Sequence, residues 1–454
     1  MVLQALPRVV KLLRPGALRS SQRPEGGMRW ISGAHNFYNN RELEAYASRD
    51  ATRLTLRQLI FFGRQLTPEK ILKSANYVRT ELPLRIAHRL RDLQALPYVV
   101  VTQEGVGQGL RFVLASFREE ENEKFCEFLQ KFLDIQCVLS CLIDRFNQNR
   151  ARPVRRSATV IPNLSLGLSL SSRYLSPDRL DSFMRRMLVT RISRRVLAEH
   201  HLALTKSFSK QGEETNEPHV GIIFTGLNVK RSVDRCTTLL RGRAPQVEGA
   251  KLTEWPVVIT DGHLDTQFPY IREQLEYIIF ELLKNAMHAT VLKHQGRGTL
   301  PPIRVTIVAG ENDIGLRISD QGGGLLAAGN ALANSNDLCS FSHVRNASRL
   351  EDKRLGALRD ASEEGLRATV EEQIVKWNRG HAEQYGQEEF NDTTLNQVKG
   401  PASSLPRIGI GLPMSKIFAT YFGGSLELVS LDGWGTDVYV RLPKLGTNLE
   451  DIEL

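Results

Sequence analysis

The first half of the chain repeats apolar residues at the spacing of amphipathic helices. In residues 121–146, apolar side chains recur every three or four positions, which gathers them on one broad helical face. Residues 176–204 begin with Ser-Pro-Asp, a sequence typical of a helix start, and continue the same period over a long stretch. Several long amphipathic helices with short links predict an antiparallel helical bundle over residues 50–210.

The segment 67–82 carries the capping residues of a further helix. Thr67 has a side chain that suits the N-cap, and Pro68 suits the first helical position, where its missing N–H is not needed. Pro83 follows, and a proline inside a helix removes a backbone hydrogen bond. The sequence therefore predicts either a kink or the start of a new helix at Pro83.

The second half of the chain alternates short strand-like runs with helical segments. It begins after a polar stretch, residues 211–219, with the composition of a linker or loop. We expect a mixed α/β domain over residues 218–447, with one sheet and helices on a face of it. The predicted strands are 220–224, 256–260, 304–310, 315–320, 424–430 and 435–443, and the predicted helices are 232–241, 271–293 and 412–421.

A long polar insertion interrupts this domain at residues 325–406. It is rich in Asn, Ser, Glu, Gln and Arg, and contains one amphipathic helical pattern. A connection of this length inside a compact domain is usually a lid, a binding insertion or a disordered segment. The residues that mark the helical pattern are Leu366, Val370, Ile374 and Trp377.

The composition is that of a soluble globular protein of two or three domains. The chain has 454 residues, of which 41% are hydrophobic and 24% charged. No apolar run approaches the roughly 18–20 residues that a membrane-spanning helix needs. The cysteines show no metal-ligand spacing, so we expect reduced structural thiols. They are Cys126, Cys137, Cys141, Cys236 and Cys339.

The positive charge is concentrated at the start of the chain. The net charge is +10, and residues 1–32 hold six basic residues and one acidic residue among Leu, Val and Ser. This composition predicts a mitochondrial transit peptide, with the cleavage site within 28–32; a disordered basic tail is the alternative. The rest of the excess is spread thinly, so we expect no nucleic-acid partner.

The helical segment FELLKNAMHAT, residues 280–290, carries a polar stripe among apolar neighbours. Successive helical residues turn by about 100°, so Glu281 and Asn285 lie one turn apart, with Lys284 and His288 beside them. A carboxylate, an amide and two bases along one side of a helix indicate a binding or catalytic face.

Two glycine-rich stretches accompany this helix. In ISDQGGGL (318–325) a strand ends at Asp320 before three glycines, and in IGIGLPMS (408–415) two spaced glycines precede Leu-Pro at a helix start. Glycine lets the backbone approach a ligand closely, and a helix N-terminus offers free N–H groups to phosphate. One such turn is a weak signal, but two turns with the polar helix favour a nucleotide site.

In this order, the three stretches resemble the N, G1 and G2 boxes of the GHKL ATPase superfamily, which includes DNA gyrase, heat-shock chaperones and sensor histidine kinases. Within it, FELLKNAMHAT, ISDQGGG, GLPMS and GWGTD (433–437) are similar to the mitochondrial 2-oxoacid dehydrogenase kinases. TLRQLIFFG (55–63), RTELPLRIAHR (79–89) and VTRISRRVLAEHHLAL (189–204) are similar to that family's bundle. The resemblance implies an N-terminal helical bundle followed by a GHKL (Bergerat) α/β sandwich that binds ATP.

The resemblance also implies that the polar stripe faces Mg-ATP. Asn285 would give a side-chain oxygen to Mg²⁺, which prefers hard ligands. Glu281 would polarise the acceptor hydroxyl or act as its general base. Lys284 and His288 would meet phosphate groups.

An adenine pocket and a lid are implied in the same way. Asp320 would accept a hydrogen bond from the adenine amino group, and Thr436 would complete the pocket through its hydroxyl and water. Gly322 and Gly324 would let the chain pass the base. The residues that the resemblance assigns to the phosphates and the lid are Arg407, Gly409, Gly411 and Leu412.

Two positions depart from the family pattern. The family usually has Arg where this chain has His288, so part of the fixed positive charge is lost near neutral pH. It usually has a further Gly where Arg407 stands, although an arginine there could instead reach a phosphate. Either change could lower activity, and neither removes the expected base or metal ligand.

The implied activity is that of a serine kinase of the mitochondrial matrix. It would phosphorylate and inactivate the E1α subunit of a 2-oxoacid dehydrogenase complex, hold an E2 lipoyl domain on the bundle, and form homodimers through the α/β domain. Tyr277 and the stretches 199–204 and 435–442 favour the branched-chain type over the alternative, a pyruvate dehydrogenase kinase. The Asp-Trp tail of pyruvate-type members is missing from 446–454.

Two other classes of protein remain open. A nucleotide-gated binding protein would bind ATP, transfer phosphate weakly and act by occupying the E2 lipoyl domain. An ATP-driven clamp would hydrolyse ATP without an acceptor, although a bundle that precedes the nucleotide domain argues against it. A phosphorylated helical histidine, at His200 or His201, is the less favoured alternative to a surface or core histidine.

Overall fold

The computed structural model describes residues 41–101, 174–209, 218–241, 255–295, 299–325, 339–341, 410–444 and 448–452. The predicted transit peptide, the helix at 121–146 and the helical pattern of the insertion lie outside these residues, as do Arg407 and Gly409.

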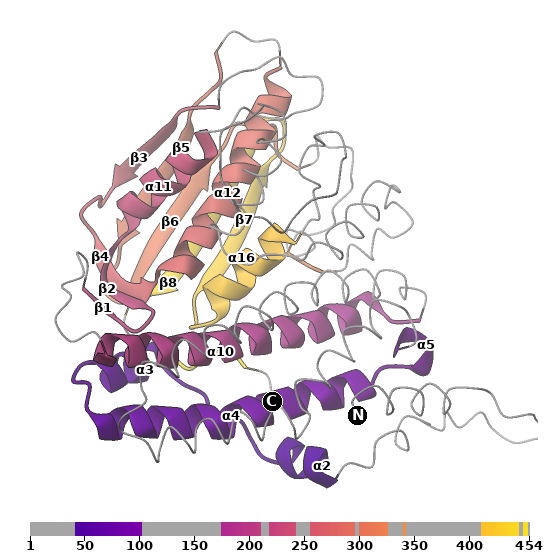
Figure 1. Cartoon of the computed structure of the whole chain (residues 1–454). Coiled ribbons are helices and arrows are strands. Elements are labelled where there is room, and N and C mark those ends of the chain that lie inside the picture. The colour runs from indigo at the N-terminus through magenta and orange to yellow at the C-terminus, as the bar shows by residue number, and fades with distance from the viewer. Residues whose placement is uncertain are drawn as a thin grey trace, which may run out of the picture. The chain divides into compact units, whose positions relative to one another are not determined.

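The described part of the first half is helical, as its periodicity predicts (Figure 1). Two helices are long, and their contacts run in opposite directions along the chain: Asp92 with Arg186, Arg85 with Ser193, and Ser74 with His201. The two long helices are therefore antiparallel; other members of the predicted bundle lie outside the described residues. The helices are α2 (Arg41–Ala47), α3 (Leu56–Gly63), α4 (Pro68–Gln94), α5 (Tyr98–Val101) and α10 (Pro177–Ser209).

The start of α4 confirms the predicted cap, and its middle corrects the alternative of a new helix. Thr67 is the N-cap, and its hydroxyl accepts a hydrogen bond from the backbone N–H of Lys70 at 3.3 Å. The helix continues through Pro83 to Gln94. Residues on both sides of Pro83 are buried, among them Val78 and Leu90, so packing outweighs the lost hydrogen bond.

The second half is a mixed α/β domain, and its described strands form two sheets instead of the predicted single sheet. One sheet has the order β1-β2-β4, and the other has the order β3-β5-β6-β8-β7. In the larger sheet β3 and β5 are parallel, and the other pairs are antiparallel. The strands are β1 (His219–Val220), β2 (Ile223–Asn228), β3 (Val258–Gly262), β4 (Gln267–Ile271), β5 (Ile303–Ala309), β6 (Asp313–Ser319), β7 (Ser425–Leu431) and β8 (Gly435–Pro443).

The smaller sheet accounts for the errors in the strand prediction. The run 220–224 is not one strand, because a turn at Gly221, with φ of +60°, separates β1 from β2. Strand β4 was not predicted, since Pro269 in its middle is untypical of a strand interior. Burial on one side compensates: Phe268 and Tyr270 are 2% and 0% exposed.

The described residues of the α/β domain form three helices: α11 (Val229–Arg241), α12 (Arg272–Lys293) and α16 (Gly411–Thr420). Helices α12 and α16 lie against one face of the larger sheet (Figure 1). On that face Val305 and Ile307 of β5 are fully buried, whereas Val308 on the other face is 50% exposed. This alternation shows which face of the sheet the helices cover. Helix α12 is central in the domain, since it contacts the sheet and has α11 and α16 beside it.

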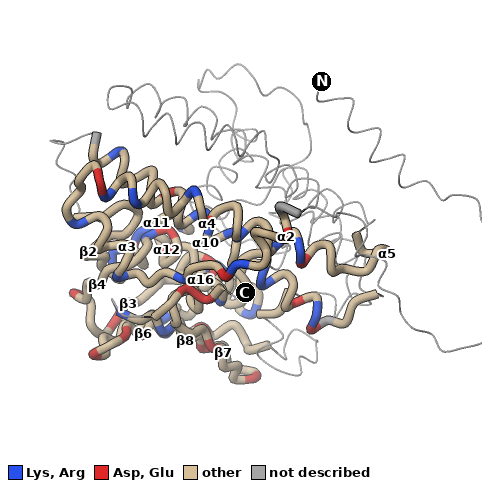
Figure 2. Tube along the Cα trace, turned by 90° about the horizontal axis from the view of Figure 1, so that it is seen from below, with Lys and Arg blue, Asp and Glu red and all other residues tan. Residues whose placement is uncertain are grey.

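Charged residues are interspersed over the described helices and strands (Figure 2). Several form pairs one helical turn apart, such as Arg195 with Glu199 at 2.8 Å and Lys230 with Asp234 at 2.6 Å. Such exposed pairs contribute little to stability, about 0.3–0.5 kcal/mol each. None of the helices that the structure describes is both long and apolar enough to cross a bilayer.

Candidate functional site

Helix α12 carries the predicted polar stripe, and it is more deeply buried than the sequence suggests. Of its 22 residues, 14 are buried, including Glu281. The Glu281 carboxylate is 3% exposed and is paired with Lys284, whose Nζ lies 2.6 Å from Oε1. A buried carboxylate needs such a partner, because an unpaired charge in the interior costs several kcal/mol. The pair therefore fixes the orientation of Glu281 within the domain.

The other two residues of the stripe differ in their surroundings. Asn285 is exposed, so its amide is open to solvent one turn from Glu281. His288 is half-buried, and its ring meets Trp255 edge-on, with centroids 5.1 Å apart and planes at 86°. The contact with Trp255 was not predicted, because nothing in the sequence pairs these two positions.

Asp320 sits where β6 ends and is locked to the neighbouring strand β8. Its Oδ1 accepts hydrogen bonds from the N–H groups of Gly322, at 2.7 Å, and Thr436, at 3.2 Å. Its own N–H donates to the carbonyl of Thr436 at 3.0 Å. Burial raises the pKa of the Asp320 carboxyl above its usual value, opposed by the two backbone N–H groups. Among the described residues, both hydrogen bonds to the carboxylate end on Oδ1.

The glycines after Asp320 allow close backbone contacts. A β carbon on residue 322 would collide with Ala289 of α12, and a β carbon on Gly435 would collide with the backbone of Asp320. Gly324 has φ of +78°, which side chains rarely adopt, and it packs against Ser430. The loop therefore passes directly over α12, with no room for side chains at these positions.

The turn between β7 and β8 holds this loop in place. Gly323 donates to the carbonyl of Trp434 at 3.0 Å, and Gly433 donates to the carbonyl of Gly323 at 2.9 Å. Lys293, at the end of α12, donates through Nζ to the carbonyls of Gly433 and Trp434, at 2.6 and 3.0 Å. Lys293 and Gly435 were not predicted to support the site. The GWGTD stretch (433–437), which contains Gly435, was the sequence feature that could have indicated this turn.

The second glycine-rich stretch meets the polar stripe directly. Gly411 is the first residue of α16, and a β carbon there would collide with the Glu281 carboxylate. Leu412 is partly buried and packs against the core. The structure thus brings Glu281 and Gly411 together at one point along α12. The Asp320 loop crosses α12 at Ala289, eight residues or about 12 Å further along.

Other candidate groups are excluded by burial or size. His200 is 3% exposed, and burial lowers its pKa to about 4, which suits a core histidine and not an accessible phosphate acceptor. Cys236 is a buried free thiol, and its pKa is raised by burial. A cleft beside Ile192 and Gln274, between α10 and α12, has a cavity volume of about 40 Å³, far below the roughly 300–1,000 Å³ of ligand pockets. In the described ranges, three or more acidic, His or Cys side chains are nowhere grouped as a metal cluster.

Comparison with known proteins shows which proteins this chain resembles. A family model described as mitochondrial branched-chain alpha-ketoacid dehydrogenase kinase matches residues 53–224. The chain is 27% identical to the mitochondrial pyruvate dehydrogenase (acetyl-transferring) kinase 2 of Saccharomyces cerevisiae, over 97% of this chain and 92% of the relative. It is 27% identical to kinase isozyme 4 of Rhinolophus ferrumequinum, over 90% and 84% of the two chains. It is 26% identical to the kinase of Arabidopsis thaliana, over 88% and 93%.

The relatives that match this chain over most of its length are mitochondrial protein kinases. The chain is thus similar to the mitochondrial 2-oxoacid dehydrogenase kinases, through the family model over residues 53–224 and through relatives of 26–27% identity over most of its length.

Proposed function

We propose that this protein is a serine kinase of the mitochondrial matrix. It transfers the γ-phosphoryl group of Mg-ATP to the E1α subunit of a 2-oxoacid dehydrogenase complex and so inactivates the complex. The observation that supports this most is the contact of Glu281 on α12 with Gly411 on α16, with the Asp320 loop crossing the same helix α12 further along at Ala289. The similarity to mitochondrial dehydrogenase kinases supports the reaction class, and the residue roles are our assignment.

The nucleotide base fits the surroundings of Asp320. Its Oδ1 is taken by two backbone N–H groups, and the other oxygen, Oδ2, is the acceptor for the adenine amino group. A buried carboxylate is stabilised by each added donor, which supports a ligand that brings one. Gly322 and Gly324 keep side chains away from the base, and the hydroxyl of Thr436 lies beside the same carboxylate.

The phosphates fit the open side of α12. Asn285 presents its amide oxygen to solvent next to Glu281 and is our candidate ligand for Mg²⁺. When bound, Mg²⁺ neutralises charge on the transferred phosphoryl group. Lys284 supplies a positive charge, and we assign Gly409, Gly411 and Leu412 to the lid over the phosphates, as the resemblance implies. Arg407 would add a second positive charge from that lid.

Glu281 is our candidate for the general base. Its pairing with Lys284 holds the carboxylate in one orientation, and the absence of a side chain on Gly411 lets α16 begin directly against it. The carboxylate is thus held to accept the proton of a serine hydroxyl as that oxygen attacks the γ-phosphate. Catalysis of this kind consists mainly of positioning and charge neutralisation.

The target complex is the finer part of the proposal. The matching family model carries the branched-chain name, whereas the relatives over the whole chain carry the pyruvate name at 26–27% identity. Tyr277 is 5% exposed and packs edge-on against Phe418 at 5.0 Å, so it would influence the choice of target only through packing. The pyruvate assignment fits these comparisons at least as well as the branched-chain assignment that the sequence favours.

The proposed partners follow from the two halves of the chain. We assign the E2 lipoyl domain to the helical bundle, which contains most of the segment that matches the family model. We assign homodimerisation to the outer face of the larger sheet. That face exposes apolar side chains, which often mark protein interfaces: Ile259, Val308, Val429, Leu431 and Tyr439.

A second candidate function is a nucleotide-gated binding protein with weak transfer. It is favoured by the edge-on contact of His288 with Trp255, which occupies the ring that would otherwise face phosphate. In that case the protein would act by occupying the E2 lipoyl domain.

Phosphopeptide mapping separates these functions. The full chain is incubated with labelled ATP and, in turn, with the branched-chain and the pyruvate dehydrogenase complexes. Phosphate on a serine of one E1α subunit, with loss of that complex's activity, supports the kinase. ATP binding without label on either E1α would contradict it and support the binding protein.

A further inference from the structure

Residues 448–452, the strap, follow β8, and two of them are buried although the neighbouring Leu449 is 51% exposed. Glu450 is 2% exposed and Ile452 is 3% exposed. Leu449 forms an isolated antiparallel bridge with Thr55, and Glu450 donates its N–H to the carbonyl of Leu54 at 2.9 Å. Irregular segments usually lie on the surface. A carboxylate that is buried in such a segment therefore needs specific partners.

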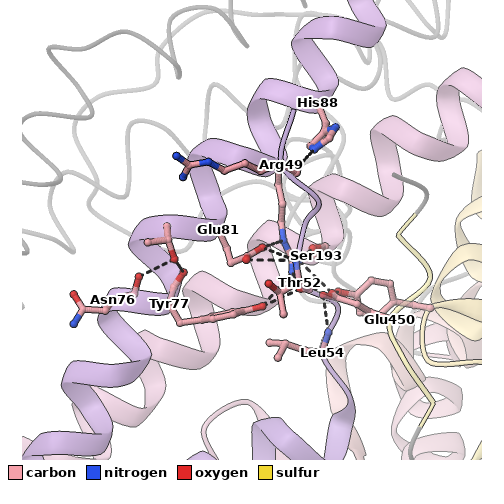
Figure 3. A network of polar contacts seen from close by, with 12 residues as sticks. Arg49, Thr52, Leu54, Asn76, Tyr77, Glu81, His88, Ser193 and Glu450 are labelled. Carbon is pink, nitrogen blue, oxygen red and sulfur yellow. Dashed lines mark hydrogen bonds and ion pairs between the residues drawn. The ribbon is translucent and has the colours of Figure 1, made fainter. Parts of the chain in front are cut away.

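The partners of Glu450 come from both halves of the chain (Figure 3). Its Oε1 accepts from Arg85 of α4 at 2.7 Å and from the Leu54 N–H at 3.0 Å. Its Oε2 accepts from the Tyr421 hydroxyl at 2.6 Å and from Arg85 at 3.3 Å. This one carboxylate therefore joins the helical bundle to the end of α16.

Arg85 keeps partners of its own when Glu450 is set aside. It is 1% exposed, its Nε lies 3.4 Å from Glu81, it donates to the Thr52 carbonyl at 2.7 Å, and it contacts Ser193 of α10. Release of the strap would thus leave the guanidinium paired, whereas losing a sole partner would strand a buried charge at high cost. We call the contact of Glu450 with Arg85 and Tyr421 the latch.

Helix α16 connects this latch to the candidate base. Tyr421 is the C-cap of α16, and its carbonyl accepts the N–H of Asp451 in the strap at 2.9 Å. The strap therefore holds both the hydroxyl and the carbonyl of Tyr421. At its other end, about 15 Å away over ten residues, the helix places Gly411 against Glu281. A helix this short moves as a rigid rod.

We propose that the strap is the mechanical link through which the helical bundle sets the position of α16 and thereby of Glu281. Arg85, Glu450 and Tyr421 are positioning residues, since none of them lies in the site itself. Docking of Glu450 pulls the end of α16 toward the bundle and seats Gly411 on the carboxylate. Changes in the bundle that move Arg85 reach the site by this route. The effect on transfer rests on the kinase function proposed above, whereas the mechanical link does not.

Hydrogen exchange on the full chain tests the link without any assumption about catalysis. Glu450→Gln removes the charge, and Tyr421→Phe removes only the hydroxyl and keeps the ring. Asp451→Asn is the matched control, since it lies in the same strap but pairs with Arg185 where both side chains are about one-third exposed. We expect amides of residues 411–420 to exchange about tenfold faster in the first two variants and at the original rate in the control.

Kinetics provide the second readout. The acceptor is the unphosphorylated form of the dehydrogenase complex that phosphopeptide mapping identifies. We expect kcat to fall about tenfold in Tyr421→Phe while KM for ATP stays within about twofold, as for a misplaced group that does not bind the nucleotide. Faster exchange confined to residues 448–452, with α16 unchanged, would overturn the link. If the wild-type chain transfers no phosphate, the proposed function is wrong, and the hydrogen-exchange result alone tests the mechanical link. If Glu450→Gln fails to fold, Tyr421→Phe carries the test.

Discussion

Gly411 lies directly against the carboxylate of Glu281, so close that a β carbon at position 411 would collide with Oε2. The two residues come from different helices, α16 and α12. The contact defines where a candidate base and a glycine-rich helix start meet, and it leads to the first prediction.

Gly411→Ala is expected to lower phosphoryl transfer about 100-fold. The added methyl group displaces the Glu281 carboxylate, and a misplacement of about 1 Å costs on this order. Overpacking should also lower the free energy of unfolding by about 1–3 kcal/mol. Transfer rates and urea denaturation measure the two effects.

The matched control is Gly315→Ala in β6. A β carbon there meets only Val308, at 3.6 Å, which is an ordinary contact. Equal losses of transfer in both variants would show that the loss in Gly411→Ala does not come from the contact with Glu281.

Glu281→Gln is expected to abolish transfer while nucleotide binding persists. The amide keeps the shape of the side chain but cannot accept the proton of the acceptor hydroxyl, and a general base contributes about 10²–10⁴-fold. Lys284→Met serves as the comparison, because it removes the ion-pair partner and leaves the carboxylate. Transfer retained in Glu281→Gln would remove the residue from the role of base.

Acidification is expected to destabilise the fold through His200 and His201. Burial lowers the pKa of each to about 4, below the unfolded value of about 6.5. The unfolded state therefore binds protons first, so the stabilisation is complete above pH 6.5 and is lost as the pH falls toward 4. Linkage gives a loss of about 2 kcal/mol per histidine between pH 7 and pH 5. The raised pKa of Asp320 acts in the opposite direction.

Urea denaturation at pH 7 and pH 5 measures this effect. His200→Gln removes one titrating group, so its stability should change less with pH than that of the original chain. An unchanged pH dependence in this variant would contradict the assignment of the lowered pKa to His200.

The sequence predicted local structure well and long-range pairings poorly. The strands of the larger sheet and helix α12 were predicted from the sequence, because their apolar residues recur at the period of a strand or of a helix. The split of the sheet in two and the strand around Pro269 depend on tertiary packing, which single-sequence patterns do not contain. The pair of Arg85 with Glu450 joins residues 365 positions apart, and no periodic signal relates them.

The candidate site shows the same division. Glu281, Asp320 and the glycines were found because their spacing resembles known boxes, and the structure gathers the described ones along α12. Lys293 and Trp255 were missed, since a lysine at a helix end and an isolated tryptophan have many ordinary roles. Their contacts with the site depend on the folded arrangement alone.

The central claim is that Mg-ATP binds along α12 between Asp320 and Glu281, and calorimetry tests it most directly. Titration of the full chain with ATP and Mg²⁺ should show saturable binding at one site per chain. Asp320→Asn should weaken that binding about 10–100-fold, because the amide replaces one acceptor by a donor facing the adenine amino group. No detectable heat of binding, or equal affinity in Asp320→Asn, would contradict the account.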